Sequence, residues 1–329
     1  MITSKKKSIS RKKGRVSSSK TRVRKSSKTS KSVVRKRKKD SPHSSRIASK
    51  DRAIALKRFE GNPIIEPLQG VYWESKATFN PSAIYGDGKV HIIYRAIGEG
   101  DVSMFGYARS RDGLVFDERG LHPAFYQTAP FRREQSDIQI PYSSGGGWNG
   151  GSEDPRLTRI KEKVYMLYTS FDGWGSIRIA LTSISFDDFV RGRWNWKVPV
   201  YISPPGEVHK NWVLFPEKIK GKYAILHGIS PRILIDYVND LDEFDGTKFI
   251  RSSSPGDTGY GESWDNRLRG AGPAPLKTKH GWLVFYHAMD VRDPNRYKVG
   301  AMLLDLNDPT KILYRARTPI LEPDEKYEN

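Results

Sequence analysis

The sequence predicts an all-β protein: a five-bladed β-propeller that lacks most of its last blade, preceded by a disordered basic tail. From about residue 53 onward, short alternating runs are separated by Gly, Asp, Asn and Pro, which is typical of strands rather than helices. A strand-turn-strand pattern recurs four times, at intervals of 59 to 74 residues. A Pro-Ile-x-Glu-Pro marker stands before the first repeat and again after the fourth.

Each repeat places a proline at the head of one strand and an aromatic residue or His near the end of the next, 11 to 13 residues later. The head prolines are Pro81, Pro155, Pro216 and Pro275. Self-similarity at this period, in a pattern made only of strands, is typical of a propeller in which each repeat is one blade. Further strands are expected at 105–108, 177–181, 232–235 and 299–304.

The marker at residues 62–67 reappears at 318–323, where it should introduce another blade, yet the sequence given continues only to Asn329. A four-bladed ring with a trailing end is one interpretation. We favour the other, in which residues 53–329 form a five-bladed propeller domain that is incomplete at its C-terminus. An open ring exposes unpaired sheet edges, which favours self-association into a homo-oligomer.

Charge is distributed unevenly along the chain. Residues 1–50 contain 20 Lys and Arg and a single acid, Asp40, which leaves 37 basic and 36 acidic residues for the rest. The segment 1–52 has few apolar residues and no Phe, Trp or Tyr, so it cannot bury enough surface to fold and is predicted to be a disordered tail. Two interpretations stay open. The tail binds nucleic acid or another polyanion nonspecifically, or it is a solvated extension without function, including one created by a mistaken gene start.

Composition excludes several classes of site. The chain has no Cys, which excludes disulfides and thiolate chemistry and fits a reducing compartment, so we expect a cytoplasmic protein. No apolar run approaches the roughly 18 residues of a membrane span, and no signal-peptide core follows the charged start. The seven His residues show no metal-ligand spacing. We therefore expect no membrane partner, no metal and no other cofactor.

Charged groups are concentrated in the segment Gly150 to Thr158, directly before the alternating run 164–168. The two adjacent carboxylates of Glu153 and Asp154 and the guanidinium of Arg156 are thus expected at the mouth of a strand, where sites are commonly built. Taken alone, the segment is better interpreted as an ordinary turn in which Arg156 pairs with a neighbouring carboxylate. The repeat changes that interpretation.

The repeat brings further polar residues to the same place, because the innermost strands of a propeller surround a central depression. The strand heads are expected to contribute Asn80, Glu153, Asp154, Arg156 and Lys218, and the ends of the second strands Arg95, His227, His287 and Asp290. Four tryptophans flank these segments: Trp148, Trp174, Trp212 and Trp264. Flat aromatic rings beside clustered polar groups suit a sugar ring, although core packing explains each of them about as well.

Six segments together carry a resemblance to a known family. They are Phe79-Asn80-Pro81, Tyr94-Arg95-Ala96, Gly151-Ser152-Glu153-Asp154-Pro155-Arg156, Phe215-Pro216-Glu217-Lys218, Trp264 followed by Gly270-Ala271-Gly272-Pro273, and Pro319-Ile320-Leu321-Glu322-Pro323. From about residue 60 to the end, the set resembles glycoside hydrolase family 130. The resemblance implies a five-bladed propeller and an enzyme acting on β-mannosides, either a phosphorylase or a hydrolase, that inverts the anomeric centre.

The resemblance also implies roles for individual residues in the cleavage of the sugar bond. Asp154 matches the general acid, which in this family protonates the glycosidic oxygen through a hydroxyl of the mannose. Asn80 and Arg95 match the residues that hold the mannose, and His287 is expected to help position it. The family also takes a pocket acid from its final blade, which is the blade expected to be incomplete here.

Phosphate binding requires several basic side chains, because a dianion in a partly dry site needs charge-assisted donors. The resemblance implies one at Lys210, beside Asn211, where Arg is commoner in the family. A second matches Arg267 or Arg269, and the sequence leaves that register open. A third is expected after His227, where this chain has Gly instead, so the cluster is only partly present.

We expect inverting cleavage of terminal β-mannosidic bonds by phosphorolysis, a glycosyl transfer to inorganic phosphate that yields mannose 1-phosphate. A β-mannoside oligosaccharide and inorganic phosphate are then the two substrates. One alternative is hydrolysis, with Glu207, Asp265 or Glu262 as the base that activates water. The other is a degenerate, non-catalytic propeller that binds a glycan or a protein partner, while the tail binds a polyanion.

Overall fold

The computed structural model describes residues 55–127, 150–171, 177–252 and 263–328. Its strands are β1 (Ala77–Gly86), β2 (Lys89–Ile97), β3 (Ser103–Ser110), β4 (Glu118–Arg119), β5 (Gly151–Ile160), β6 (Lys163–Phe171), β7 (Ile177–Ser185), β8 (Val200–Tyr201), β9 (Val213–Leu214), β10 (Tyr223–Gly228), β11 (Leu234–Val238), β12 (Arg267–Ala271), β13 (Leu276–Thr278), β14 (Gly281–Asp290), β15 (Asp293–Leu304) and β16 (Ile312–Arg315). The helices of the described part are short: α1 (Phe186–Val190) and the 3-10 turns η1 (Leu241–Glu243) and η2 (Lys326–Glu328). The prediction of an all-β protein is confirmed.

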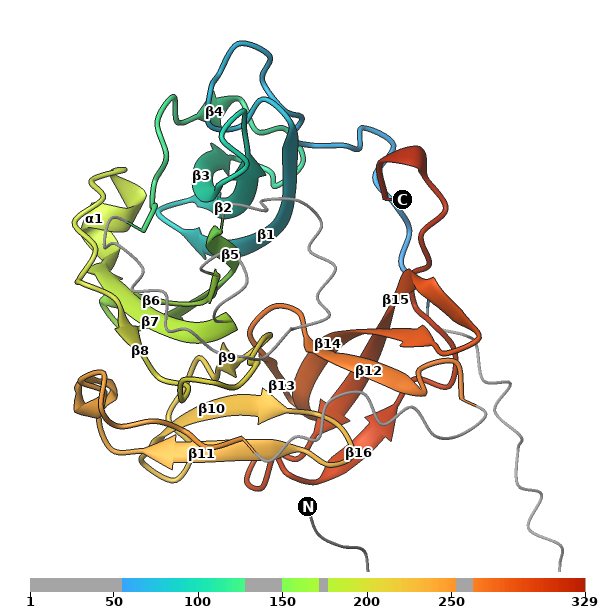
Figure 1. Cartoon of the computed structure of the whole chain (residues 1–329). Coiled ribbons are helices and arrows are strands. Elements are labelled where there is room, and N and C mark those ends of the chain that lie inside the picture. Colours follow the sequence, from blue (N-terminus) through green and yellow to red (C-terminus); the bar gives the residue numbers. More distant parts are fainter. Residues whose placement is uncertain (1–54, 128–149, 172–176, 253–262, 329) are drawn as a thin grey trace, which may run out of the picture. The chain divides into compact units, whose positions relative to one another are not determined.

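The strands form successive antiparallel groups along the chain, as the coloured arrows of Figure 1 show. The first group is β1–β4 and the second β5–β8, and a parallel contact between Ser103 and Gly151 links them into one sheet. The third is β9–β11 and the fourth β12–β16. The strands predicted at 105–108, 177–181 and 299–304 lie within β3, β7 and β15, and the one predicted at 232–235 begins two residues later, as β11. These groups agree with a propeller-like fold, whereas the predicted number of five blades stays a prediction.

Hydrophobic side chains fill the spaces between neighbouring groups. Phe105, Tyr168 and Phe189 belong to a cluster that joins the first two groups. Leu167, Trp212 and Ile225 belong to one that joins the second and third, and Phe215, Trp282 and Tyr286 to one that joins the third and fourth. Burial of these large side chains supplies the main stabilisation of the fold. It also fixes the groups relative to one another, so the inner strands meet at defined positions.

A residue with positive φ stands at or just before the innermost strand of each group. Asn80 (φ 47°) and Asp154 (φ 51°) lie where the register of β1 and β5 shifts against their partner strands. Asn211 (φ 63°) precedes β9, and Gly270 (φ 151°) lies at a register shift in β12. Asn, Asp and Gly are the residues that tolerate this conformation best, and a bulge of this kind re-aims a side chain. The four positions are thus equivalent in the repeat.

This equivalence corrects the predicted register of the third and fourth repeats. Pro81 and Pro155 directly follow the residue with positive φ, whereas Pro216 and Pro275 follow it by five residues. The head of the third repeat is therefore Asn211, and Lys218 lies elsewhere. The Lys218 ammonium donates to the backbone oxygen of Asn239 at 3.3 Å and lies 4.2 Å from the centre of the Tyr223 ring.

A buried tyrosine of β2 is held by a carboxylate and a guanidinium, an arrangement that we call a tyrosine clamp. The hydroxyl of Tyr94 donates to Glu74 at 2.8 Å, and Arg119 donates to both, at 2.9 Å to the hydroxyl and 2.7 Å to the carboxylate. Gly106 stands opposite Tyr94 on β3, and a Cβ there would lie 2.2 Å from the tyrosine ring. The clamp thus connects β2 with β4 and with the segment that precedes β1.

The fourth group contains a second tyrosine clamp. The Tyr286 hydroxyl donates to Asp265 at 2.7 Å, and the Nε of Arg315 donates to the same carboxylate at 2.8 Å. Asp265 is 1% exposed and also accepts a hydrogen bond from Ser263. The two oxygens of Asp265 are engaged by these three side chains. Asp265 therefore has a structural role in the fold and does not act as the base that activates water, the role considered for it from the sequence.

The second Pro-Ile-x-Glu-Pro marker lies along the fourth group. The backbone N–H of Ile320 donates to Val299 of β15 at 2.8 Å, and the Val299 N–H donates to Leu321 at 2.9 Å. The N–H of Leu56 in turn donates to the oxygen of Ile320 at 2.8 Å. The first and last described segments of the domain therefore pair with each other.

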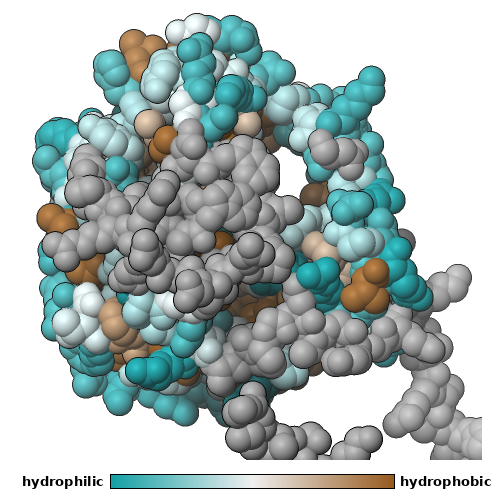
Figure 2. Space-filling view, in the orientation of Figure 1, coloured by the Kyte–Doolittle hydropathy of each residue, from teal (hydrophilic) through white to brown (hydrophobic). Residues whose placement is uncertain are grey.

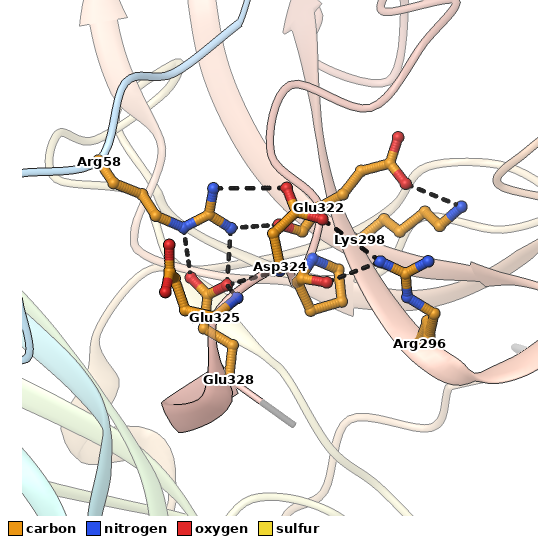
Figure 3. Close-up of polar contacts among 8 residues, drawn as sticks. Arg58, Arg296, Lys298, Glu322, Asp324, Glu325 and Glu328 are labelled. Atoms are coloured by element: carbon orange, nitrogen blue, oxygen red, sulfur yellow. Dashed lines mark hydrogen bonds and ion pairs between the residues drawn. The ribbon is translucent and has the colours of Figure 1, made fainter.

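Charged side chains hold these two segments together, as Figure 3 shows. Arg58 donates to the two carboxylate oxygens of Glu328 at 2.8 and 2.6 Å and also to the backbone oxygen of Glu322. Lys298 lies 3.1 Å from the Glu322 carboxylate, and Arg296 donates to the backbone oxygen of Pro323 at 2.7 Å. Arg58 thus ties the first described segment to the last, while Lys298 and Arg296 of β15 hold the second marker against the fourth group.

Hydrophilic residues cover most of the described surface in the space-filling view (Figure 2). Among the described residues, no helix has the length and apolar character needed to cross a membrane. The tail predicted at 1–52, and with it the predicted boundary of the propeller domain, lies outside the residues that the structure describes. Trp148, Trp174 and Glu262 also lie outside them.

Candidate active site

The carboxylate of Asp154 is the centre of a group of polar side chains contributed by several strand groups. Asn80 donates from Nδ2 to its Oδ1 at 2.7 Å, and the Arg95 Nη1 lies 3.3 Å from the same oxygen. The Asp154 side chain is 12% exposed and that of Arg95 only 2%. Arg95 is fixed further by a hydrogen bond from its Nε to the hydroxyl of Ser103, at 2.9 Å. A carboxylate at the bulge of β5 is thus held from β1 and β2.

Two opposing effects act on the pKa of Asp154. Burial by itself raises this pKa, because a charged carboxylate loses its hydration. The positive charges of Arg95 and Arg156 act in the opposite direction, together with the hydrogen bond from Asn80 and the proximity of His287. The net result is a pKa below the ordinary value of an aspartic acid. In the unliganded protein Asp154 is therefore an ionised carboxylate in a positive environment.

The neighbouring carboxylate, Glu153, lies deeper. It is fully buried, and its Oε1 accepts a hydrogen bond from Arg95 at 2.7 Å. Its Oε2 accepts one from the ammonium of Lys210 at 3.1 Å. Burial lowers the pKa of Lys210 well below its ordinary value, and the charges of Arg95 and Arg269 lower it further. A positive charge on Lys210 is thus costly in this place.

Arg156 links the second strand group to the third and fourth. Its Nη2 donates to the Oδ1 of Asn211 at 3.2 Å, and the Nδ2 of Asn211 donates to the backbone oxygen of Arg269 at 3.1 Å. The Nε of Arg156 is buried and has no hydrogen-bond partner among the described residues. A buried donor of this kind is uncommon in a folded protein, so it is available to a ligand.

His287 completes the group from β14. Its pKa is lowered to about 3, first by burial and then by the charge of Arg156, with further lowering by Arg269 and Lys210 and an opposing effect of Asp154. The imidazole is therefore neutral at physiological pH and able both to donate and to accept a hydrogen bond. We refer to these residues together as the Asp154 cluster: Asn80, Arg95, Glu153, Asp154, Arg156, Lys210, Asn211, Arg269 and His287.

Gly270 is needed for this arrangement, because a side chain there would collide with Asn211. A Cβ at Gly270 would lie 2.5 Å from the Cβ of Asn211, and the φ of 151° is itself unfavourable for other residues. We expect Gly270→Ala to displace Asn211 and Arg156 and to lower kcat/KM by about 10²-fold, as small misplacements do in catalytic sites. Steady-state kinetics check this expectation.

The control is Gly272→Ala, two residues further along. A Cβ at Gly272 meets only the backbone oxygen of Phe285 at 3.5 Å, an ordinary contact. We expect this variant to keep wild-type kcat/KM. Equal activities of the two variants would show that the contact with Asn211 does not matter for the reaction.

The chain matches the model of a known family over most of its length. A family model described as beta-1,4-mannooligosaccharide phosphorylase, that of glycoside hydrolase family 130, matches residues 47–329. The chain belongs to glycoside hydrolase family 130. The resemblance inferred from the sequence and the prediction that the protein is an enzyme are both confirmed.

Individual members of family 130 are similar over most of the chain. A 1,2-beta-oligomannan phosphorylase of Thermoanaerobacter sp. (strain X514) is 36% identical over 281 residues, which cover 82% of this chain and 83% of that protein. A beta-1,2-mannobiose phosphorylase of the same organism is 34% identical over 288 residues, covering 83% and 84%. Among solved structures, the beta-1,2-mannobiose phosphorylase from Listeria innocua in complex with beta-1,2-mannobiose has a TM-score of 0.57 and 25% identity, covering 82% of this chain and 85% of that one.

Two residues predicted for the site of this family-130 chain, His227 and Asp290, make the contacts described here with residues outside the Asp154 cluster. His227 contacts Ser252 at 3.0 Å and Asp236 at 3.1 Å. Asp290 is engaged by Arg292 at 2.8 Å, in addition to its other contacts. Their roles in binding a sugar stay predictions.

The structure distinguishes between the two arginines of β12 that the sequence left open. Arg269 acts electrostatically on both Lys210 and His287, which places it with the Asp154 cluster. Arg267 lies opposite Met289 in the pairing of β12 with β14. Of the two, Arg269 is the better candidate to bind an anion beside Lys210.

The two described tryptophans that the sequence placed beside the site pack against other aromatic rings, Trp212 in the interior and Trp264 half-buried. Trp212 is 1% exposed, with the rings of His209 and His227 at 5.2 and 5.4 Å. Trp264 stacks on Tyr286 at 6.2 Å. These contacts fit the alternative interpretation, core packing, and a place beside a sugar ring stays a prediction for both.

Sequence reasoning missed two residues that shape the Asp154 cluster. Ser103 supports Arg95 from the adjacent strand β3, and no local pattern marks it. Gly270 stood inside the Gly-Ala-Gly-Pro segment used for the resemblance, without a role. One sequence signal could have indicated its role: Gly270 lies five residues before Pro275, just as Asn211 lies five residues before Pro216.

Proposed function

We propose that this enzyme cleaves terminal β-mannosidic bonds by phosphorolysis, with inversion, and releases mannose 1-phosphate. The observation that carries the proposal is the carboxylate of Asp154 beside Arg95 and Arg156, with Lys210 and Arg269 in the same cluster. A general acid next to a concentrated positive charge suits a reaction between a glycoside and an inorganic anion. The names of the curated relatives, all of them phosphorylases, support the same reaction.

The proposed reaction needs one proton donor and one nucleophile. An oxygen of phosphate attacks the anomeric carbon while the bond from that carbon to the glycosidic oxygen breaks. The proton of Asp154 goes to the departing oxygen, and the product is an α-configured sugar phosphate because attack comes from the face opposite the leaving group. Asn80, Arg95 and His287 hold the mannose, and Lys210 with Arg269 binds the phosphate.

The lowered pKa of Asp154 in the unliganded protein fits a reaction in which phosphate binds before Asp154 donates its proton. A general acid must carry a proton when the bond breaks, and the positive environment of the unliganded cluster opposes that. Phosphate bound beside Arg156 and Lys210 neutralises part of this charge, which raises the pKa of Asp154 and favours its protonated form. Binding of the anion thus prepares the acid.

We further propose a β-1,2-linked substrate. The three curated relatives at 34 to 36% identity are named for β-1,2-mannosides, whereas the matching family model is described by a β-1,4 activity. A specific curated relative that covers most of the chain is a better guide to linkage than a description of the whole family. The loops that would select the linkage, 120–150 and 251–266, lie largely outside the described residues.

The test is an assay of mannobioses with β-1,2 and β-1,4 linkages, each with and without phosphate. We expect mannose 1-phosphate from the β-1,2 disaccharide only when phosphate is present, and at least tenfold slower release from the β-1,4 disaccharide, as differences of 1–2 kcal/mol in transition-state binding produce. Ion-exchange chromatography separates the two sugar products. Free mannose formed without phosphate would replace phosphorolysis by hydrolysis. No turnover of any mannoside would contradict the proposal.

A further inference from the structure

Glu153 was expected to bind substrate, but its carboxylate faces two cations of the protein instead. The side chain is fully buried, and its two oxygens accept from Arg95 at 2.7 Å and from Lys210 at 3.1 Å. Arg95 is 2% exposed and Lys210 is 15% exposed. A carboxylate placed in this way acts on the substrate through the cations that it holds.

The surroundings of Lys210 explain why a carboxylate is needed there. Arg95 approaches from β2 and Arg269 from β12, and both disfavour the protonated ammonium, as burial does. His287 on β14 is neutral, so it does not compensate. Asp154 and Arg156 lie on β5 with Glu153, belong to the same cluster and carry opposite charges.

The opposing effects on the charge of residue 210 matter because this residue is a lysine. A buried lysine loses its proton readily, whereas an arginine keeps its charge at any physiological pH. An uncharged amine would bind phosphate poorly, because it offers neither a positive charge nor a third donor hydrogen. Phosphate binding by this chain therefore depends on what keeps Lys210 protonated.

We propose that Glu153 is a positioning residue that keeps Lys210 protonated and directed at the phosphate site, and thereby sets the pH range of phosphate binding. Glu153 itself touches neither substrate. This inference rests on the proposed function in one respect, since it takes Lys210 to be a ligand of the phosphate.

The experiment compares Glu153→Gln with the wild type, because glutamine keeps the shape of the side chain and removes its charge. We expect the KM for inorganic phosphate to rise because less of Lys210 is protonated, by up to about tenfold for each unit that the Lys210 pKa falls once the pH lies above that pKa, with a smaller change in kcat. The ratio of variant to wild-type kcat/KM for phosphate should fall further as pH rises. Taking the ratio removes the titration of phosphate itself, which is common to both proteins.

Two further variants separate charge from structure. Glu153→Asp keeps the negative charge and should keep the wild-type pH dependence even if its KM changes. The double variant Glu153→Gln with Lys210→Arg should lose the steep pH dependence of the single variant, because arginine does not deprotonate. A double variant with the same pH dependence as Glu153→Gln would overturn the inference, and so would a single variant with the wild-type profile.

Calorimetric titration with inorganic phosphate keeps this test separate from that of the proposed function. If the wild type binds phosphate and Glu153→Gln binds it with the same pH dependence, the inference is wrong whatever the enzyme's activity. If phosphate binding follows the expected pH dependence but no mannose 1-phosphate is formed, the proposed function is wrong and the role of Glu153 stands. Thermal melting of each variant shows whether the fold is retained.

Discussion

Replacing Asp154 with Asn is expected to lower kcat for phosphorolysis by roughly 10²–10⁴-fold, the usual contribution of a general acid. The physical reason is that an amide cannot supply the proton that the departing oxygen needs. Asn also tolerates the positive φ of this position as well as Asp does, so the bulge of β5 should persist. The measurement is the initial rate of mannose 1-phosphate release at saturating phosphate.

Asp87→Asn provides the matched control for this substitution. Asp87 also has a positive φ, of 50°, and lies in the turn between β1 and β2, away from the Asp154 cluster. We expect it to keep full activity. Asp154→Asn with a kcat close to that of the control would remove Asp154 from its proposed role as the acid.

Replacing Arg315 with Ala is expected to destabilise the fold by about 3 kcal/mol, the lower end of the range for breaking a buried ion pair. The substitution leaves the Asp265 carboxylate, which is 1% exposed, without its guanidinium partner. The lower end is appropriate because Arg315 is 36% exposed, so water can reach part of the vacated space. For a domain of this size each kcal/mol lowers Tm by roughly 2–4 °C. Differential scanning calorimetry measures the change.

The control for Arg315 is Arg191→Ala, which removes an exposed pair with Asp187 on α1. Both side chains are at least 60% exposed, and such pairs contribute about 0.3–0.5 kcal/mol. We expect a Tm within about 2 °C of the wild type for this variant. If Arg315→Ala melted at the same temperature as Arg191→Ala, the second tyrosine clamp would not be a stabilising feature.

Much of the fold followed from local patterns. The alternation in the run 164–168 and in residues 299–304 identifies strands because side chains on successive residues of a strand face opposite sides. Adjacent charges before an apolar strand also drew attention to the Glu153-Asp154-Pro155-Arg156 segment, although only the repeat favoured a site there over an ordinary turn. In both cases the signal lies within a few neighbouring residues, which is the range over which sequence patterns are readable.

The predicted register of the repeats was wrong where a local signal, the proline at the strand head, was misleading. Proline marked the strand heads in the first two repeats, and the same marker was carried to Pro216 and Pro275. The property shared by all four repeats is a residue that tolerates positive φ, namely Asn80, Asp154, Asn211 or Gly270. A proline fixes its own φ but does not reveal the conformation of the residue five positions earlier.

The sequence by itself indicated that the chain is all-β and repeated and that it belongs to glycoside hydrolase family 130, and it predicted that the site depends on Asp154. Tertiary structure alone decided which of Arg267 and Arg269 joins Lys210, that Lys218 lies elsewhere, and that Asp265 holds a tyrosine clamp. It also turned Glu153 from a candidate ligand of the substrate into a partner of two cations. The reason is physical: burial and charge pairing depend on which side chains different strands bring within a few ångströms, and no spacing along one strand records that.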